Sequence, residues 1–139
     1  MNQAILGGID EAPSTTLTRY NYLMGGENSS VNWLEINTRL QIVPTGGTIS
    51  ALRIELSQAP GAGKSYAFTL MLNGSASALT CTVSGTDTTA SDTSNSVAVV
   101  AGDTVEIRCT PSGTPASVRV RWSTIFASTT VGESICLIQ

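Results

Sequence analysis

The sequence predicts an all-β fold: a sandwich of two antiparallel sheets, in the form of a jelly roll of about eight strands. Two observations predict it. Apolar and polar residues alternate with a period of two in many short runs, as in strands that bury one face. Turn signals separate these runs, and no segment combines a helical period with caps. We expect residues 1–139 to form a single domain, since this is an ordinary domain length.

In chain order, the alternation predicts strands at 18–24, 34–43, 51–56, 66–72, 79–83, 97–99, 104–109, 118–126 and 135–138. In each alternating run, the apolar side chains of one parity are expected to face the core. The run that ends at Pro44 is expected to bury one set of aliphatic side chains, namely Leu34, Ile36, Leu40 and Ile42. In the next run, Arg53 and Glu55 are expected to face outward.

Turn chemistry separates the runs. Asn73-Gly74 predicts a tight hairpin, because both residues tolerate a positive φ. Further turns are expected at 45–47, 101–103 and 111–115. The Ser/Thr-rich stretch 84–96 is expected to form an edge strand and a surface loop, since threonine favours β structure.

An immunoglobulin-like sandwich is the alternative fold. Immunoglobulin domains carry a tryptophan between two cysteines along the chain. Here Trp122 follows both Cys81 and Cys109, so the jelly roll is the favoured prediction.

The composition argues against several classes of partner. Charged residues make up 12% of the chain, and the net charge is −3. The closest basic pair is Arg119 and Arg121, which is too small a patch for a nucleic acid or an anionic membrane. The N-terminus Met1–Leu6 has no basic segment followed by a long apolar stretch, so we expect no signal peptide and synthesis in a cytoplasm.

Catalytic chemistry is not expected, and neither is a cofactor. The chain has no histidine, which excludes Ser-His-Asp and Cys-His catalysis and the common zinc sites. No pattern selects a catalytic pair among the acids, which are Asp10, Glu11, Glu27, Glu35, Glu55, Asp87, Asp92, Asp103, Glu106 and Glu133. Asp87 and Asp92 share a polar stretch, where either a solvated surface or a weak cation site is the interpretation.

One stretch looks like a phosphate-binding loop, at 58–65. The motif requires glycine at its first position, where this chain has Gln58. It also requires a helix after the Lys64-Ser65 pair, and the residues that follow alternate as in a strand. We therefore interpret 58–65 as a hairpin loop.

Two groups of side chains are candidates for binding. An outward charged row is expected from Arg53/Glu55, Glu106/Arg108 and Arg119/Arg121, either as a solvated face with cross-strand pairs or as a subunit interface. Trp33, Tyr20 and Tyr22 either belong to the core or form an aromatic platform for a sugar.

The three cysteines, Cys81, Cys109 and Cys136, each lie in an apolar run and are expected to be buried small side chains. A Cys81–Cys109 disulfide is open if the two strands are neighbours.

Between residues 45 and 127 the chain resembles a domain of phage and prophage structural proteins. The resemblance is carried by the segments 59–70, 72–74, 95–105 and 118–123, which read APGAGKSYAFTL, LNG, NSVAVVAGDTV and VRVRWS. The succession of a strand, Asn-Gly, a strand and Ala-Gly-Asp-Thr-Val also resembles the trimeric jelly-roll heads of the complement and tumour-necrosis-factor superfamily.

This resemblance implies a non-catalytic jelly roll that assembles as a homotrimer on a virion. The expected role is a capsid decoration or stabilising protein, with viral capsid or tail proteins as partners. The alternative is a carbohydrate- or receptor-binding module of a phage fibre or spike. No binding residue is transferred from the resemblance.

Overall fold

Nine strands in two layers make up the structure, which is a computed structural model describing residues 2–9, 11–25, 33–133 and 135. The strands are β1 (Asn2–Ile9), β2 (Arg19–Asn21), β3 (Gln41–Ile42), β4 (Gly47–Leu56), β5 (Gly61–Leu72), β6 (Ser75–Gly85), β7 (Thr89–Val99), β8 (Thr104–Ser112) and β9 (Val120–Ser128). The described residues include no helix, and therefore none that could span a membrane.

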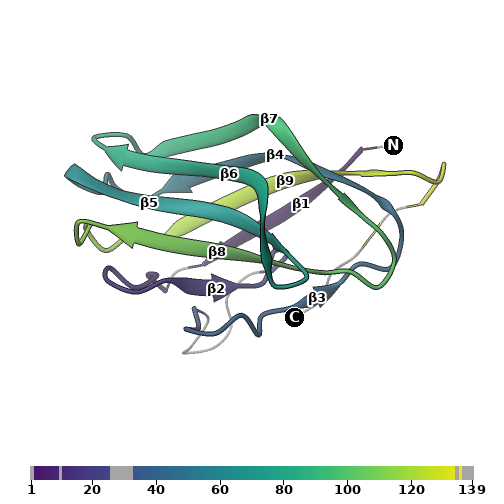
Figure 1. Cartoon of the computed structure of the whole chain (residues 1–139). Helices are drawn as coiled ribbons and strands as arrows, with labels where there is room; N and C mark the ends of the chain where they lie inside the picture. The colour runs from purple at the N-terminus through teal and green to yellow at the C-terminus, as the bar shows by residue number, and fades with distance from the viewer. Residues whose placement is uncertain (1, 10, 26–32, 134, 136–139) are drawn as a thin grey trace.

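One sheet has the strand order β1-β9-β4-β7 and the other has the order β2-β8-β5-β6, with β3 also paired to β8. All of these pairings are antiparallel. Figure 1 shows β7, β4, β9 and β1 as one layer and β6, β5, β8 and β2 as the other. From β6 onward each successive strand crosses to the opposite sheet, and the first and last strands lie side by side. This strand order is that of a jelly roll, so the predicted fold class is confirmed.

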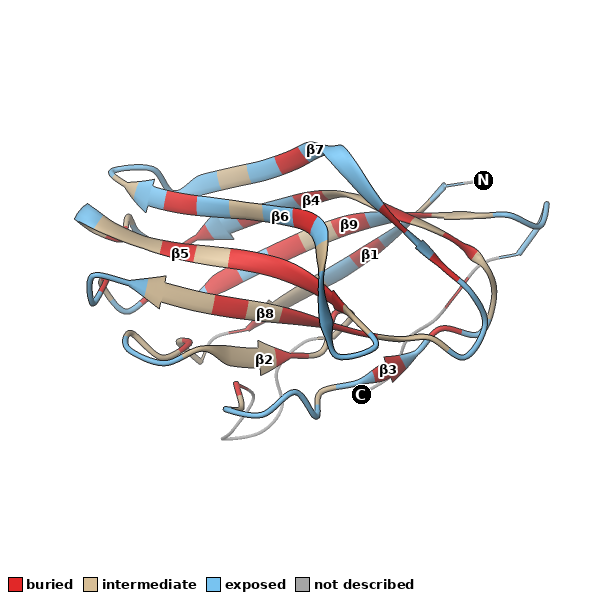
Figure 2. Ribbon diagram, in the orientation of Figure 1, coloured by how far each residue is buried: buried red, intermediate tan, exposed pale blue. Residues whose placement is uncertain are grey.

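The core lies between the two sheets (Figure 2), and in strands such as β4 and β9 every second residue is buried against it. The alternation predicted the buried parity correctly in β4, where Leu52, Ile54 and Leu56 are at most 3% exposed. In β5, Tyr66 and Phe68 are fully buried as expected. Burying one face of each sheet provides the main driving force for this arrangement.

Aromatic side chains in the core need close approach to the backbone of facing strands. Gly7 in β1 pairs with Trp122 in β9, and a Cβ on Gly7 would lie 2.2 Å from the indole ring. Trp122 packs edge to face on Trp33, with ring centroids 5.8 Å apart, and its indole N–H donates to the carbonyl of Leu23 at 2.7 Å. Glycine at position 7 therefore makes room for the largest side chain of the core.

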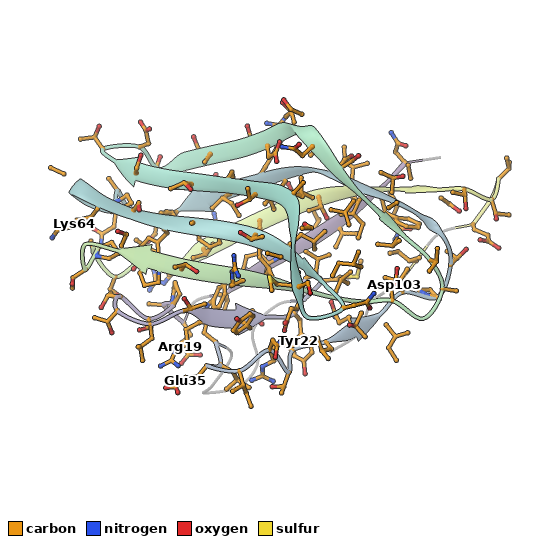
Figure 3. The ribbon with its side chains drawn as sticks, in the orientation of Figure 1. Arg19, Tyr22, Glu35, Lys64 and Asp103 are labelled. Carbon is orange, nitrogen blue, oxygen red and sulfur yellow. The ribbon has the colours of Figure 1, made fainter. Side chains whose placement is uncertain are left out.

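The hairpin between β5 and β6 turns at Asn73-Gly74, and both residues have a positive φ, as predicted. The Asn73 side chain also accepts a hydrogen bond from the backbone N–H of Thr104 at 2.9 Å. Its amide donates to a carboxylate oxygen of Asp103, the last residue of the predicted 101–103 turn, at 2.9 Å. These bonds hold two neighbouring turns together at the end of the sandwich where Asp103 is labelled in Figure 3.

The prediction for the run that ends at Pro44 was wrong. Ile36, Leu40 and Ile42 were expected in the core but are 63%, 42% and 67% exposed. Only Gln41–Ile42 is a strand, and the buried residues at this end are Gln41 and Val43. Within this run only the two residues of β3, at the edge of the sheet, form a ladder, with β8, so the alternation over 34–40 does not face a second layer.

The N-terminal strand β1 was not expected from the alternation. Its buried residues Ile5 and Ile9 are separated by Gly7, which contributes no side chain to the pattern. The expected edge strand within 84–96 is β7, which forms the border of its sheet. The last predicted strand, 135–138, lies outside the described residues except for Ile135, which is buried.

Candidate functional site

The outer face of the sheet β1-β9-β4-β7 carries a group of charged side chains near the ends of β4 and β9. Arg53 and Glu55 alternate with the buried residues of β4, and Arg121 alternates with those of β9. Glu55 lies directly opposite Arg121, and Arg53 lies opposite Ser123. The three charged side chains therefore stand next to one another on the central strands of the sheet.

Glu55 and Arg121 form an ion pair, in which an Nη1 of Arg121 lies 3.4 Å from a carboxylate oxygen of Glu55. Both side chains are largely exposed, at 60% for Glu55 and 80% for Arg121. In the described part of the chain, the Arg53 side chain makes neither a hydrogen bond nor an ion pair. An exposed pair of this kind contributes little to stability, so the Arg121 guanidinium remains open to exchange of partners.

Two adjoining hollows lie beside this pair, with volumes of about 470 and 780 Å³. Both are lined by Gly7, Glu55 and Arg121. The smaller hollow adds Gly8, Ile9, Ser57 and Arg119, and the larger adds Leu6, Arg53, Ile54, Thr89, Ala90, Ser91, Trp122 and Ser123. We call these two hollows together the sheet groove.

The groove exists because short side chains alternate with long ones on this face. Gly8 and Ser123 leave the sheet uncovered, whereas Arg53, Glu55 and Arg121 stand out from it as walls. The two hollows meet at the Glu55–Arg121 pair, which contributes to the lining of both. The groove therefore combines a backbone floor with charged walls and a hydroxyl-rich rim.

The lining is basic, although the chain as a whole is acidic. Among the described residues, the groove is lined by three of the seven cationic residues, Arg53, Arg119 and Arg121, and by one acid, Glu55, so these four residues carry a net charge of +2. The remainder of the sequence holds four cations and nine acids, a net charge of −5. Such a local reversal of sign favours anions at this place on the surface.

The predicted charged row is thus only partly assembled. Arg53, Glu55, Arg119 and Arg121 come together, but Glu106 and Arg108 belong to β8 in the other sheet. The expectation that Glu106 faces solvent was wrong, because this residue is fully buried. The alternation correctly predicted that Glu106 lies on the side opposite to Val105 and Ile107, but it did not predict the chain segment that covers this side.

Glu106 occupies an unusual environment on the outer side of the sheet β2-β8-β5-β6. It lies opposite Met71, which is only 3% exposed. In the described part of the chain, neither carboxyl oxygen has a hydrogen-bond partner of normal geometry. Burial raises the pKa of Glu106 to about 7, and the backbone N–H of Arg39 offsets part of this effect by favouring the charged form.

The three aromatic residues proposed as a sugar platform do not form one. Trp33 is 6% exposed and belongs to the core, where it packs on Trp122. Tyr22 is half-buried, and the guanidinium of Arg39 lies 5.1 Å from the centre of its ring. Tyr20 is half-buried at the edge strand β2. Figure 3 places Tyr22 near Arg19 and Glu35, which form an ion pair of 2.8 Å.

The proposed cation site at Asp87 and Asp92 is not assembled either. Asp92 lies within β7, whereas Asp87 precedes this strand in an exposed turn. Both carboxylate oxygens of Asp92 accept hydrogen bonds, from the backbone of Thr80, Ser94 and Asn95 and from the Asn95 side chain, at 3.0–3.2 Å. Among the described residues, no three His, Cys, Asp or Glu side chains are grouped closely enough to hold a metal ion.

No helix follows the stretch 58–65, as predicted, but the interpretation as a hairpin loop was wrong. β5 already begins at Gly61, and residues 57–60 connect β4 in one sheet to β5 in the other. Its backbone is held by the opposite loop, where the N–H of Ala116 donates to the carbonyl of Pro60 at 2.9 Å. Lys64 lies at this end of the sandwich (Figure 3). Because no helix N-terminus follows, the stretch lacks the amide cluster that a phosphate requires.

Cys81 and Cys109 do not form the disulfide that the sequence left open. Cys81 in β6 and Cys109 in β8 both lie opposite Phe68 of β5, so a whole strand separates them. Two strand spacings amount to about 9.6 Å, beyond the reach of a disulfide, and both thiols are free. Desolvation raises the pKa of the Cys81 thiol to about 11 and also raises that of Cys109, so neither is a reactive thiolate. Cys136 lies outside the described residues.

The sequence is not matched by any protein-family model, and a search of curated proteins finds no match.

Sequence reasoning found the charged residues of the groove but missed its floor and rim. Leu6, Gly7 and Gly8 belong to the strand that the alternation did not predict. Thr89 and Ser91 come from the Ser/Thr-rich stretch, where composition alone gave no reason to select them. No local signal relates β1 to β9, because their pairing joins the two ends of the chain.

Proposed function

We propose that this chain is a non-catalytic structural protein of a viral particle, a capsid decoration protein that assembles as a homotrimer. The jelly roll is one of the architectures used by capsid and lectin domains, which makes the fold suitable for this role. A fold alone does not define a function, so the proposal needs support from the surface.

The observation that carries the proposal is an exposed apolar strip beside the edge strand β3. Ile36, Leu40 and Ile42 lie on the chain segment that reaches β3, and Val100 lies in the neighbouring turn. That turn is attached to the same segment, since Val43 accepts a hydrogen bond from the N–H of Gly102 and donates one to the carbonyl of Asp103. Ile36, Ile42 and Val100 are each more than 60% exposed.

Exposed aliphatic side chains at or near a sheet edge are unfavourable in water, and a partner surface would remove them from it. A second and a third copy of the chain are the partners that suit a particle protein, because symmetric oligomers of one chain are the usual assemblies. A trimer would then present three copies of the charged face to its surroundings.

The first test is the native mass in solution, by size-exclusion chromatography with light scattering. We expect a trimer of the 14.4 kDa chain. Replacing Ile36 and Ile42 together by threonine should shift the population to monomer without unfolding it, whereas the matched control Val131→Thr, at a residue that is 99% exposed elsewhere, should remain trimeric. A monomeric wild type, or a trimer that fails to sediment with capsids encoded by the same genome, would count against the proposal.

Carbohydrate recognition is the second candidate function, and the sheet groove is the observation that favours it. The volume of each hollow lies in the range of small-ligand sites, and their lining carries the hydroxyl groups of Ser57, Thr89, Ser91 and Ser123. A glycan array probed with the folded protein tests this function, and a flat response would remove its support.

A further inference from the structure

We propose that the sheet groove recognises the carboxylate group of an acidic saccharide, with Arg53 and Arg121 as the binding residues and Glu55 as an internal competitor. The inference rests on the second proposed function and names the ligand class for it. It does not depend on trimer assembly or on a place in a particle.

The charges of the groove support an anionic ligand. Arg53 and Arg121 both line the larger hollow, and they are diagonal neighbours on β4 and β9. Diagonal neighbours on one face of a sheet lie about 7–8 Å apart, a separation at which two long side chains can converge on one group. Among the described residues that line the larger hollow, Glu55 is the one acid, so this trio of charged side chains has a net charge of +1.

Arginine is well suited to a carboxylate. Its planar guanidinium presents parallel N–H groups that match the two oxygens. Arg53 has no partner within the described chain, and Arg121 holds Glu55 by a single exposed contact of 3.4 Å. An incoming carboxylate can therefore bind Arg53 directly and share or displace the contact of Arg121.

The rest of the lining fits a sugar better than a peptide. β4 and β9 are central strands, paired on both sides, so their backbone groups are not available for the addition of a peptide strand. The two arginines thus lie away from the free edges of the sheet, which are at β1 and β7. Around them the groove offers side-chain chemistry, namely the hydroxyls of Thr89, Ser91 and Ser123 together with the exposed aliphatic surface of Leu6. Hydroxyls and one apolar contact match the polar edges and the apolar face of a sugar ring.

The size of the groove sets a limit on the ligand. Hollows of about 470 and 780 Å³ are of the size that encloses a small molecule, which corresponds to one or two sugar residues. A longer acidic polysaccharide would extend beyond the groove and contact it with one or two residues at a time.

The experiment compares two sugars that differ by one group, sodium D-glucuronate and D-glucose. NMR titration of the folded, full-length protein at low salt reports both affinity and location. We expect glucuronate to shift the signals of Leu6, Arg53, Thr89 and Arg121, and glucose to bind at least tenfold more weakly. Raising the salt concentration should weaken the glucuronate response, because the contact is an exposed charge pair.

Variants then assign the roles. Arg53→Gln and Arg121→Gln should each weaken glucuronate binding about tenfold, and Glu55→Gln should strengthen it several-fold by freeing Arg121. The matched control is Lys64→Gln, which removes the same charge from a strand of the other sheet. It should leave the affinity unchanged.

Three outcomes would overturn the inference. Equal binding of glucose would exclude carboxylate recognition while leaving carbohydrate binding intact. Equal competition by a short polyglutamate peptide would show that the groove accepts anions without regard to the sugar. If the Glu55→Gln variant binds glucuronate no more tightly than the wild type, Glu55 does not compete with the ligand for Arg121. None of these outcomes bears on the native mass, so the structural proposal is tested separately.

Discussion

Glu106 shows how a single carboxyl group connects burial to the pH dependence of stability. It is fully buried, and its pKa is raised to about 7 from the ordinary value of 4.5, mainly by desolvation. In the unfolded chain the same group ionises near its ordinary pKa. Its contribution to stability is therefore fully present below pH 4.5 and is lost as the pH rises to about 7.

We expect Glu106→Gln to remove this loss. Between the two pKa values, about two and a half units apart, the wild type should lose about 3 kcal/mol of unfolding free energy that the variant keeps. Urea unfolding of both proteins at pH 4.5, 6 and 8 measures the difference. The variant should be the more stable protein at pH 8, and the two should be similar at pH 4.5.

Glu55→Gln is the control for this measurement, since Glu55 is an exposed carboxylate on the opposite sheet. It keeps Glu106 and should therefore lose unfolding free energy between pH 4.5 and 8 as the wild type does. If the wild type and Glu106→Gln have parallel pH profiles, the carboxyl group is hydrated in solution and the segment around Arg39 does not seal it.

For Glu106, the sequence predicts which side of the sheet the residue lies on but not that it is buried. Alternation places Glu106 on the side opposite to Val105 and Ile107, and that side is correct. Whether the outer side of a sheet meets water depends on what lies over it, and here the cover comes from a segment more than sixty residues earlier, near Arg39. A local pattern carries no information about such a contact.

At the scale of an element, the carboxylate of Asp92 stabilises a bulge in β7. In the pairing with β4, Asp92 lies opposite Leu52 while Ser96 lies opposite Ser50, so β7 contains extra residues and bulges between them. Asp92 accepts the backbone N–H groups of Ser94 and Asn95 inside this bulge, which would otherwise lose their ladder partners. It also accepts the N–H of Thr80 and so attaches β7 to β6 across the edges of the two sheets.

We expect Asp92→Ala to lower the unfolding free energy by about 2 kcal/mol at pH 7, because several charge-assisted hydrogen bonds are lost. These bonds lower the pKa of Asp92 from 3.8 to about 2. The stabilisation in the wild type is thus present above pH 3.8 and is lost as the pH falls to about 2. The difference between the proteins, measured by thermal unfolding at pH 7 and in the range 2–4, should shrink in acid.

Asp87→Ala is the matched control, since Asp87 is an exposed aspartate in the turn before the same strand. A surface substitution of this kind usually changes stability by about 0.5 kcal/mol or less. Equal effects of the two substitutions would mean that Asp92 does not organise the bulge.

Elements with strong alternation were predicted well, and those without it were not. β4, β5 and β8 have the expected buried parity because their core residues are large and regularly spaced. β1 was not predicted because the position between Ile5 and Ile9 is glycine, which adds no apolar side chain to the pattern. This glycine leaves space for the side chain of Trp122. That space is a property of the facing strand, so the sequence of β1 alone does not indicate it.

At the scale of the whole molecule, the charge and the apolar surface are separated. The basic lining of the sheet groove belongs to the sheet β1-β9-β4-β7, whereas the apolar strip runs beside β3 at the edge of the other sheet. This separation lets one region serve self-association while the other stays open for a ligand. A trimer that forms through the apolar strip can therefore be told apart from a trimer that forms through the charged side chains of the groove.

The two kinds of interface respond in opposite ways to salt. Exposed charge pairs are screened as the ionic strength rises, whereas burial of apolar surface is strengthened by salts such as sulfate. We therefore expect the trimer, measured by light scattering, to persist or increase between 50 mM and 1 M salt. We also expect Arg121→Glu to leave the native mass unchanged. Dissociation in high salt, or on this charge reversal, would place the subunit contact on the charged face and would close the groove to any ligand in the assembled protein.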